Sequence, residues 1–291
     1  MPRPWLALIL CTLTGCLGAE QIEHGTFLKR FRDQAITPDH ALIEVALIER
    51  PVGDDYINHQ VWKHTDELLV DLDRRKAHDE NGLRIGQLVG APPVEFQQLL
   101  TSQRCCINPH ALIFPAGKTS TIWLGQTAPV SFFDFVEGRT RTELTFDQAR
   151  CGLDVDARFD RHGRTILTLT PKVEHGEQLF PFRPVPERST WELRIEKAAK
   201  KFPELSWEVT LGPNQYLFVG GRIDRLRTLG VTALTQLEGN LGVQRLLVIR
   251  NCRSVTAHEA HGNTVAELIA ADKTPPLALQ ATLPATRAKT H

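Results

Sequence analysis

The sequence predicts an α+β fold that is mainly β, a bent antiparallel double sheet with two N-terminal helices packed on it. Three observations predict this fold: an early run rich in β-branched residues, two later segments with helical spacing of apolar residues, and many short strand patterns separated by Gly and Pro turns after residue 105. The chain has 291 residues, of which 42% are hydrophobic, so it can form one large core or two modest ones.

The first strand and the two helices are predicted from the spacing of apolar residues. Ala41–Glu49 is apolar and ends before Pro51, which predicts a strand. In Asn58–His78 apolar residues recur at helical intervals and acidic residues precede basic ones, as the helix dipole favours. Pro92-Pro93 then opens a second helix that runs through Leu100.

Two glutamates interrupt the first strand. Glu44 and Glu49 are an odd number of residues apart, which places them on opposite faces of the strand. This argues against a shared catalytic site, and we expect solvated or inter-subunit ionic roles for them.

The rest of the domain is predicted as strands in an antiparallel meander. Arg161–Arg164 contains a glycine suited to a tight hairpin turn, and Glu187–Phe202 is charged, which predicts a loop or a short helix. The predicted strands are Ala111–Phe114, Thr119–Leu124, Ala128–Phe135, Thr140–Phe146, Gly152–Asp160, Thr165–Val173, Ser206–Leu211, Gln215–Val219 and Arg245–Ile249.

The N-terminus predicts export. Arg3 precedes an apolar run that is too short to span a bilayer, and the run ends in a sequence that resembles the bacterial lipobox, Leu13-Thr14-Gly15-Cys16. Residues 1–15 are then a lipoprotein signal peptide, Cys16 carries the lipid that attaches the protein to a membrane, and 16–39 are a tether. An ordinary signal peptide cleaved after Ala19 is the alternative.

Residues 254–291 are expected to be a partly disordered tail, after a folded domain at 40–253.

Composition and motifs argue against several function classes. The formal net charge is zero, which gives no electrostatic reason to expect a nucleic-acid partner. Neither a His-Glu-x-x-His nor a Gly-x-Ser-x-Gly motif occurs, so we expect no enzyme activity, no metal and no cofactor. Four cysteines follow the signal, and an oxidising compartment permits two disulfides or buried free thiols: Cys105, Cys106, Cys151 and Cys252.

The order of the strand units resembles the C-terminal core of the bacterial secretins, the ring-forming outer-membrane proteins of type II and type III secretion and of pilus systems. The resemblance covers His40 to Arg253. It rests on the opening strand Ala41–Glu49, on Ile107–Ile113 followed by Lys118–Gly125, and on Gly152–Val155 with its hairpin. It ends with Asn214–Gly221 and the last strand, Leu246–Ile249.

This resemblance implies a structural function. The chain would be a lipoprotein in the cell envelope, at the outer membrane and facing the periplasm, that forms homo-oligomers or binds other secretion-system proteins. Long strands shared between subunits need glycines where they bend, and the candidates are Gly125, Gly152, Gly220 and Gly221. A monomeric membrane-anchored β-rich binding module without channel activity is the alternative.

Two features qualify the resemblance. We expect a short tether in place of the N-terminal periplasmic modules usual in secretins, and no amphipathic hairpin long enough for a membrane-spanning wall is evident. The aromatic run Phe132-Phe133-Asp134-Phe135 would either face the membrane through its three Phe side chains or pack in the core.

Overall fold

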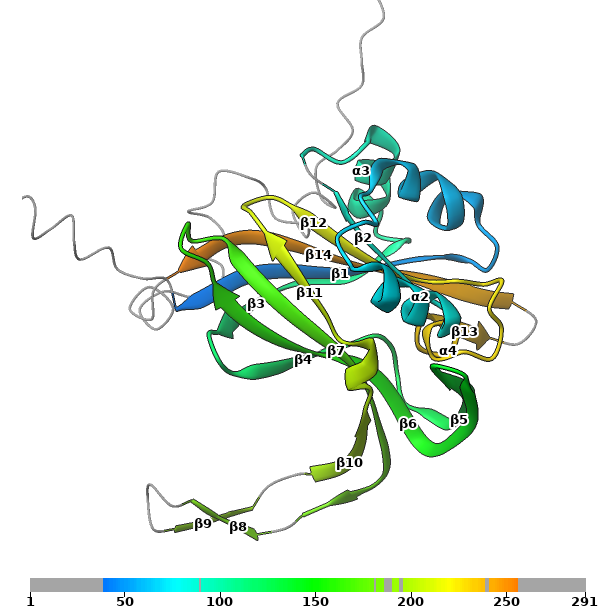
Figure 1. The fold of residues 1–291 in the computed structure, drawn as a ribbon, viewed down its shortest axis with the longest axis vertical. Helices are drawn as coiled ribbons and strands as arrows, with labels where there is room; N and C mark the ends of the chain where they lie inside the picture. Colours follow the sequence, from blue (N-terminus) through cyan, green and yellow to red (C-terminus); the bar gives the residue numbers. More distant parts are fainter. Residues whose placement is uncertain are drawn as a thin grey trace, which may run out of the picture. The chain divides into compact units, whose positions relative to one another are not determined.

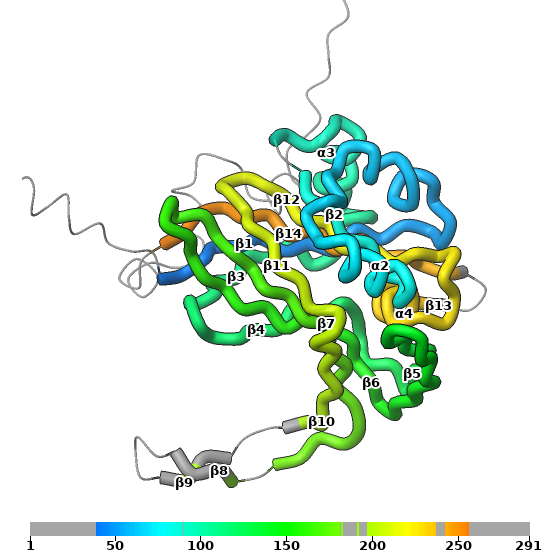
Figure 2. Tube along the Cα trace, viewed as in Figure 1, coloured from blue at the N-terminus to red at the C-terminus, as the bar shows by residue number. Residues whose placement is uncertain are grey.

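The computed structural model describes residues 39–88, 90–180, 182–185, 190–193, 196–238 and 241–255 (Figures 1 and 2). The predicted signal peptide, Cys16, nearly all of the tether and nearly all of the C-terminal tail lie outside these residues. Within them the structure confirms a mainly β fold, in which curled antiparallel sheets are accompanied by a few short helices.

The first sheet contains the predicted opening strand as an interior strand. Its strands are β1 (His40–Pro51), β2 (Leu83–Leu88), β3 (Cys106–Pro115), β12 (Tyr216–Gly221), β13 (Thr235–Glu238) and β14 (Leu241–Val255). The order is β2-β12-β14-β1-β3, with β13 also paired to β14. Residues Ala41–Ile48 are buried without interruption, because both faces of β1 are covered by other parts of the protein.

The second sheet has two unusually long strands. Its members are β4 (Thr119–Trp123), β5 (Ala128–Glu137), β6 (Thr140–Phe159), β7 (Thr165–Leu179), β10 (Glu196–Lys201) and β11 (Trp207–Leu211). The order is β10-β7-β6-β4, while β11 pairs with β7 and β5 with β6. The predicted hairpin turn joins β6 to β7, and Gly163 there has a φ of 73°.

The structure corrects the predicted meander in one respect. The segments Thr140–Phe146 and Gly152–Asp160 form one continuous strand, β6, of 20 residues. Its first half pairs with β5 and its second half with β4, so β4 and β5 are both neighbours of β6 and not of each other. The polar residues between the two halves mark a change of partner and not a break in the strand.

The prediction of a loop or short helix over Glu187–Phe202 is wrong where the structure describes this segment. β9 (Thr190–Leu193) pairs with β8 (Phe182–Val185), and β10 pairs with the end of β7. Lys200 is exposed, as charged residues often are on an edge strand, so the charge of the segment does not prevent it from forming strands.

The first predicted helix, Asn58–His78, is also corrected. The chain forms a π-helical turn at Tyr56–Gln60, a 3-10 turn at Val61–His64 and then α2 (Leu72–Glu80). Asp66 lies between them and makes a β-bridge with Gln87 of β2, so sheet pairing replaces the middle of the helix. Asp71 caps α2 through its side chain, which accepts a hydrogen bond from the Arg74 backbone N–H.

The two faces of the first sheet are covered differently. On one face, Phe218 of β12 packs on Phe96 of α3 (Val94–Thr101), with a ring separation of 4.8 Å. On the other face, side chains of both sheets share one core, which includes Phe114, Phe133 and the fully buried Trp207. Two smaller helical elements, α4 (Leu229–Leu234) and the turn Pro203–Leu205, complete the described fold.

The four cysteines of the domain are free thiols in the structure. Burial raises the pKa of Cys151 to about 12 and that of Cys106 to about 11. Both stay protonated at neutral pH, and buried thiols of this kind behave as small apolar residues.

Candidate functional site

Both long strands of the second sheet change their outer partner at the same level. β6 leaves β5 at Ala149 and joins β4 at Gly152, and the residue paired with Gly152 across the hairpin is Lys172. On β7, pairing with β11 ends at Leu169 and pairing with β10 begins at Lys172. Figure 1 shows the result, two ribbons that diverge from this level, one made of β5 and β6 and the other of β7 and β10.

Two of the predicted glycines lie at this divergence. A Cβ atom on Gly152 would lie 2.8 Å from the ring of Trp123. The carbonyl oxygen of Gly125 accepts a hydrogen bond of 3.0 Å from Nε of Arg150. A Cβ atom on Gly125 would lie 2.7 Å from Nη1 of Arg245. The glycines therefore leave room for large side chains, and their role in bending the strands remains a prediction.

Charged side chains surround the indole of Trp123. The guanidinium of Arg150 lies 4.5 Å and the ammonium of Lys172 4.9 Å from the ring centroid, within the range of cation–π attraction. Asp154 is buried and binds Lys172 at 2.9 Å and Lys201 at 2.7 Å. We call Trp123, Arg150, Asp154, Lys172 and Lys201 the Trp123 cluster. It joins β4, β6, β7 and β10 where the two ribbons diverge.

The carboxyl of Asp154 is held ionised by its partners. Burial by itself would raise its pKa, but hydrogen bonds from Lys201, Lys172 and the Thr121 hydroxyl outweigh burial and lower the pKa below its ordinary value of 3.8. A lowered pKa stabilises the folded state above pH 3.8, and this contribution is lost as the pH falls through the lowered value.

Replacement of Asp154 by Asn is therefore expected to destabilise the protein most at neutral pH. The difference in free energy of unfolding between wild type and Asp154→Asn should shrink as the pH falls below about 4, because the wild-type carboxyl becomes neutral there. Urea unfolding between pH 7 and pH 3 measures this difference. Asp147→Asn, at an exposed position on the same strand, is the control and should change little. A difference that stays constant over this range would contradict the prediction.

The other two predicted glycines lie at the end of β12. A Cβ atom on Gly220 would lie 2.7 Å from the ring of Trp62, and one on Gly221 would lie 3.1 Å from the carbonyl oxygen of Gly230. These positions let the turn Val61–His64 and helix α4 approach the backbone of β12 closely. Sequence reasoning singled out both glycines but missed Gly230, their close neighbour.

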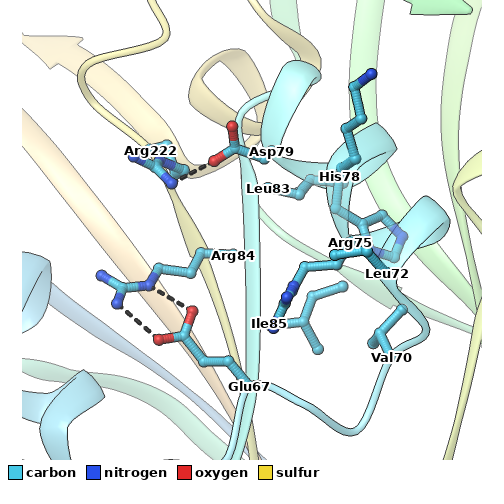
Figure 3. Close-up of a pocket in the computed structure, with 11 residues that line it drawn as sticks. Glu67, Val70, Leu72, Arg75, His78, Asp79, Leu83, Arg84, Ile85 and Arg222 are labelled. Atoms are coloured by element: carbon cyan, nitrogen blue, oxygen red, sulfur yellow. Dashed lines mark hydrogen bonds and ion pairs between the residues drawn. The ribbon is translucent and has the colours of Figure 1, made fainter. Parts of the chain in front are cut away.

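A pocket of about 410 Å³ lies beside α2 and β2 (Figure 3). Arg84 binds both carboxylate oxygens of Glu67, at 2.8 and 2.7 Å, and Arg222 pairs with Asp79. Burial lowers the pKa of His78, whose Nε2 lies 2.9 Å from the carbonyl oxygen of Leu205. Glu67, Asp79, Arg84 and Arg222 are thus engaged in ion pairs within the chain, and the pair of Arg222 with Asp79 joins α2 to the loop after β12.

A larger hollow of about 650 Å³ lies between the start of β5, the loop before α4, and α4 itself. Phe132 lies in its wall and is exposed, with the guanidinium of Arg227 5.6 Å from its ring centroid. Phe133 and Phe135 are buried against Phe202, with ring separations of 6.0 and 4.9 Å. The expectation that they face a membrane is therefore corrected, because alternate residues of β5 point into the core.

Sequence reasoning also missed the partners of Glu44 and Glu49. Glu44 forms a buried ion pair of 2.7 Å with Arg250, and Glu49 binds Arg245 at 2.7 Å. Both arginines lie on β14 of the same chain, so the expectation of solvated or inter-subunit roles is wrong. A signal was present, since the two arginines have the same spacing as the two glutamates and pair with them in antiparallel order.

No group of three His, Cys, Asp or Glu side chains that could hold a metal ion occurs in the described part of the chain. Nor does any helix among these residues have the length and apolar character needed to cross a membrane.

No family model matches the sequence, and no curated protein matches it. One solved structure that matches is the "InvG secretin domain beta-barrel from Salmonella SPI-1 injectisome NC-base", at 10% identity and a TM-score of 0.25, over 86% of this chain and 74% of that chain. Another is the Salmonella SPI-1 type III secretion injectisome secretin InvG, with the same identity and TM-score, over 85% of this chain and 76% of that chain. Both matched chains are secretins. A likeness this distant carries no argument about activity.

Proposed function

We propose that this protein is a secretin-like envelope lipoprotein that assembles with copies of itself as a structural component of a protein secretion or export apparatus. The observation that carries the proposal is the pair of long strands, β6 with 20 residues and β7 with 15. Strands of globular proteins are usually about 5–6 residues long. Strands that exchange partners and continue as two diverging ribbons are suited to contact neighbouring subunits.

The strand units on which the resemblance to the secretins rests also support this proposal. The fold contains the opening strand, the hairpin at Gly163 and the last strand, β14, all in the order on which the resemblance rests. The Trp123 cluster would fix the angle between the two ribbons, with Gly152 as the point where β6 bends. Such a fixed angle is needed if identical subunits are to close into a ring.

Membrane attachment is the second part of the proposal. The segment Leu13-Thr14-Gly15-Cys16 is the motive, because lipid on the Cys16 thiol together with an added acyl chain anchors a protein stably. The folded domain would then stand on the periplasmic side of the outer membrane. No cofactor is needed for this role.

The protein extracted from membranes with mild detergent is expected to be a ring-shaped oligomer. Light scattering on the purified protein should give a mass several times that of one chain, which is 32.7 kDa before the signal peptide is removed, and negative-stain microscopy should show rings. Cys16→Ser should release the protein from the membrane fraction without changing its oligomeric mass. Compact monomers from the wild type would overturn the ring, and membrane retention of Cys16→Ser would overturn the anchor.

A monomeric, membrane-anchored binding module remains the second candidate, and the hollow of about 650 Å³ favours it. Its volume falls in the range of about 300–1,000 Å³ that is typical of ligand sites. The same mass measurement separates the two candidates.

A further inference from the structure

Exposed large apolar side chains concentrate in two places on this protein. Within the described residues, one group lines the hollow beside β5 and α4, and another lies at the end of the ribbon formed by β7 and β10. We call the first the groove, formed by Val52, Val130, Phe132 and Leu226, and the second the arm, formed by Leu179, Phe180, Phe182 and Trp191. Contiguous exposed apolar groups on a folded protein usually mark interaction sites.

The arm and the groove differ in shape. The arm is a two-stranded ribbon end, in which β8 carries Phe182 and its partner strand β9 carries Trp191. The groove is concave, with walls from the start of β5, the loop before α4, and α4 itself. A narrow projection bearing aromatic rings and an apolar hollow are complementary in shape.

Their chemistry is complementary as well. Arg227 and Arg245 line the groove, and Arg227 already lies over the ring of Phe132 at 5.6 Å. Arginine is the cation most often found over aromatic rings, and tryptophan is its best partner. The arm offers Trp191 and two phenylalanines, so its rings can bind the apolar floor and the exposed guanidinium of Arg227 together.

The arm lies apart from the groove of its own chain in this fold. Figure 1 shows β8 and β9 beyond the end of the ribbon of β7 and β10, apart from β5 and α4. An arm that binds a groove must therefore come from another copy. Such a contact joins two different surfaces of identical chains, and repeated contacts of this type generate closed rings or open filaments.

We propose that the arm of one copy inserts into the groove of the next copy, and that this contact joins the subunits of the ring. The inference rests on the proposed function, since it names the interface of that assembly. A flat lipid surface is the other possible partner of the arm, but it cannot enter a concave groove. If the arm bound lipid, the exposed apolar residues of the groove would stay in contact with water.

The first test compares Leu226→Glu and Trp191→Glu with Leu68→Glu, each in the full chain. Leu226, Trp191 and Leu68 are 71%, 70% and 74% exposed, so the same charge is introduced at equally accessible positions. We expect the first two variants to lose the ring peak in detergent and Leu68→Glu to keep it. Unchanged melting temperatures would show that all three fold. Rings formed equally by all three variants would overturn the arm-to-groove contact.

The second test is a mixed disulfide, which remains informative if a charged variant fails to fold. Full chains carrying Trp191→Cys and Leu226→Cys, with different affinity tags, are co-expressed and oxidised. A disulfide-linked heterodimer is expected, and Leu68→Cys in place of Leu226→Cys should give none, which also controls for native thiols. Equal cross-linking of the two would overturn the proposal.

The outcomes separate this inference from the proposed function. A monomeric wild type would overturn both. A wild type that forms rings, with variants that also form rings and no specific cross-link, would overturn only the arm-to-groove contact. If Trp191→Glu lowers binding to vesicles of phosphatidylglycerol and phosphatidylethanolamine and leaves the mass unchanged, the arm contacts lipid and the inference is wrong.

Discussion

Replacement of Arg250 by methionine is expected to lower the free energy of unfolding by about 3–5 kcal/mol, because it leaves the carboxylate of Glu44 buried without its ion-pair partner. Arg250 is 0% and Glu44 2% exposed, and Nη2 of the arginine lies 2.7 Å from Oε2 of the glutamate. The two residues are directly opposed on β14 and β1, at the centre of the first sheet. Urea unfolding of the full chain, followed by tryptophan fluorescence, measures the loss.

Two further variants control this prediction. Glu44→Leu combined with Arg250→Met removes both charges and should recover most of the lost stability, since no buried charge remains. Lys76→Met breaks an exposed pair of 3.8 Å with Glu80 and should cost less than about 1 kcal/mol. If Arg250→Met costs no more than Lys76→Met, the pair is not as buried as the structure shows.

The second large effect is expected at Gly230 of α4, where alanine should cost roughly 3 kcal/mol or more. An added Cβ atom would lie 2.1 Å from the carbonyl oxygen of Gly82 and 2.8 Å from the backbone nitrogen of Leu83. These are backbone atoms at the start of β2 and cannot move aside as a flexible side chain could. The backbone N–H of Gly230 also donates to the carbonyl oxygen of Asn81 at 2.9 Å, which fixes the close approach.

Gly117→Ala is the matched control for Gly230→Ala. Gly117 has a φ of 71° and open space around its Cβ position, so alanine there should cost only the strain of the left-handed conformation, about 1–2 kcal/mol. Thermal and urea unfolding of both variants measure the difference. Because α4 forms a wall of the groove, Gly230→Ala should also reduce the oligomeric mass. Equal stability of the two variants would contradict the close contact.

Local sequence patterns were sufficient to predict the strands whose residues face a core on both sides or alternate regularly. Ala41–Glu49 forms β1 because its apolar run can be buried only between two layers. The turn at Gly163 follows from the need for a positive φ between two paired strands. The prediction for Glu187–Phe202 was wrong where the segment is described, because Glu196–Lys201 forms a strand at the edge of the sheet, where propensity says little.

The site was harder to predict from sequence than the fold. The glycines at positions 125, 152, 220 and 221 could be singled out, but not the aromatic and cationic groups that occupy the space beside them. Contacts such as Gly152 with Trp123, or Gly220 with Trp62, join residues that are far apart in the chain. A single sequence does not show which distant residues contact each other in the fold.

What the sequence by itself determined is the mainly β fold, the early apolar strand, the hairpin turn and the absence of familiar catalytic motifs, since each depends on residues close together in the chain. Only the tertiary structure decided that β6 is one strand with two partners, that Glu44 is neutralised by Arg250, and that exposed apolar residues gather in an arm and a groove. The physical reason is that burial and charge pairing depend on which surfaces the folded chain brings together, and local spacing does not specify them.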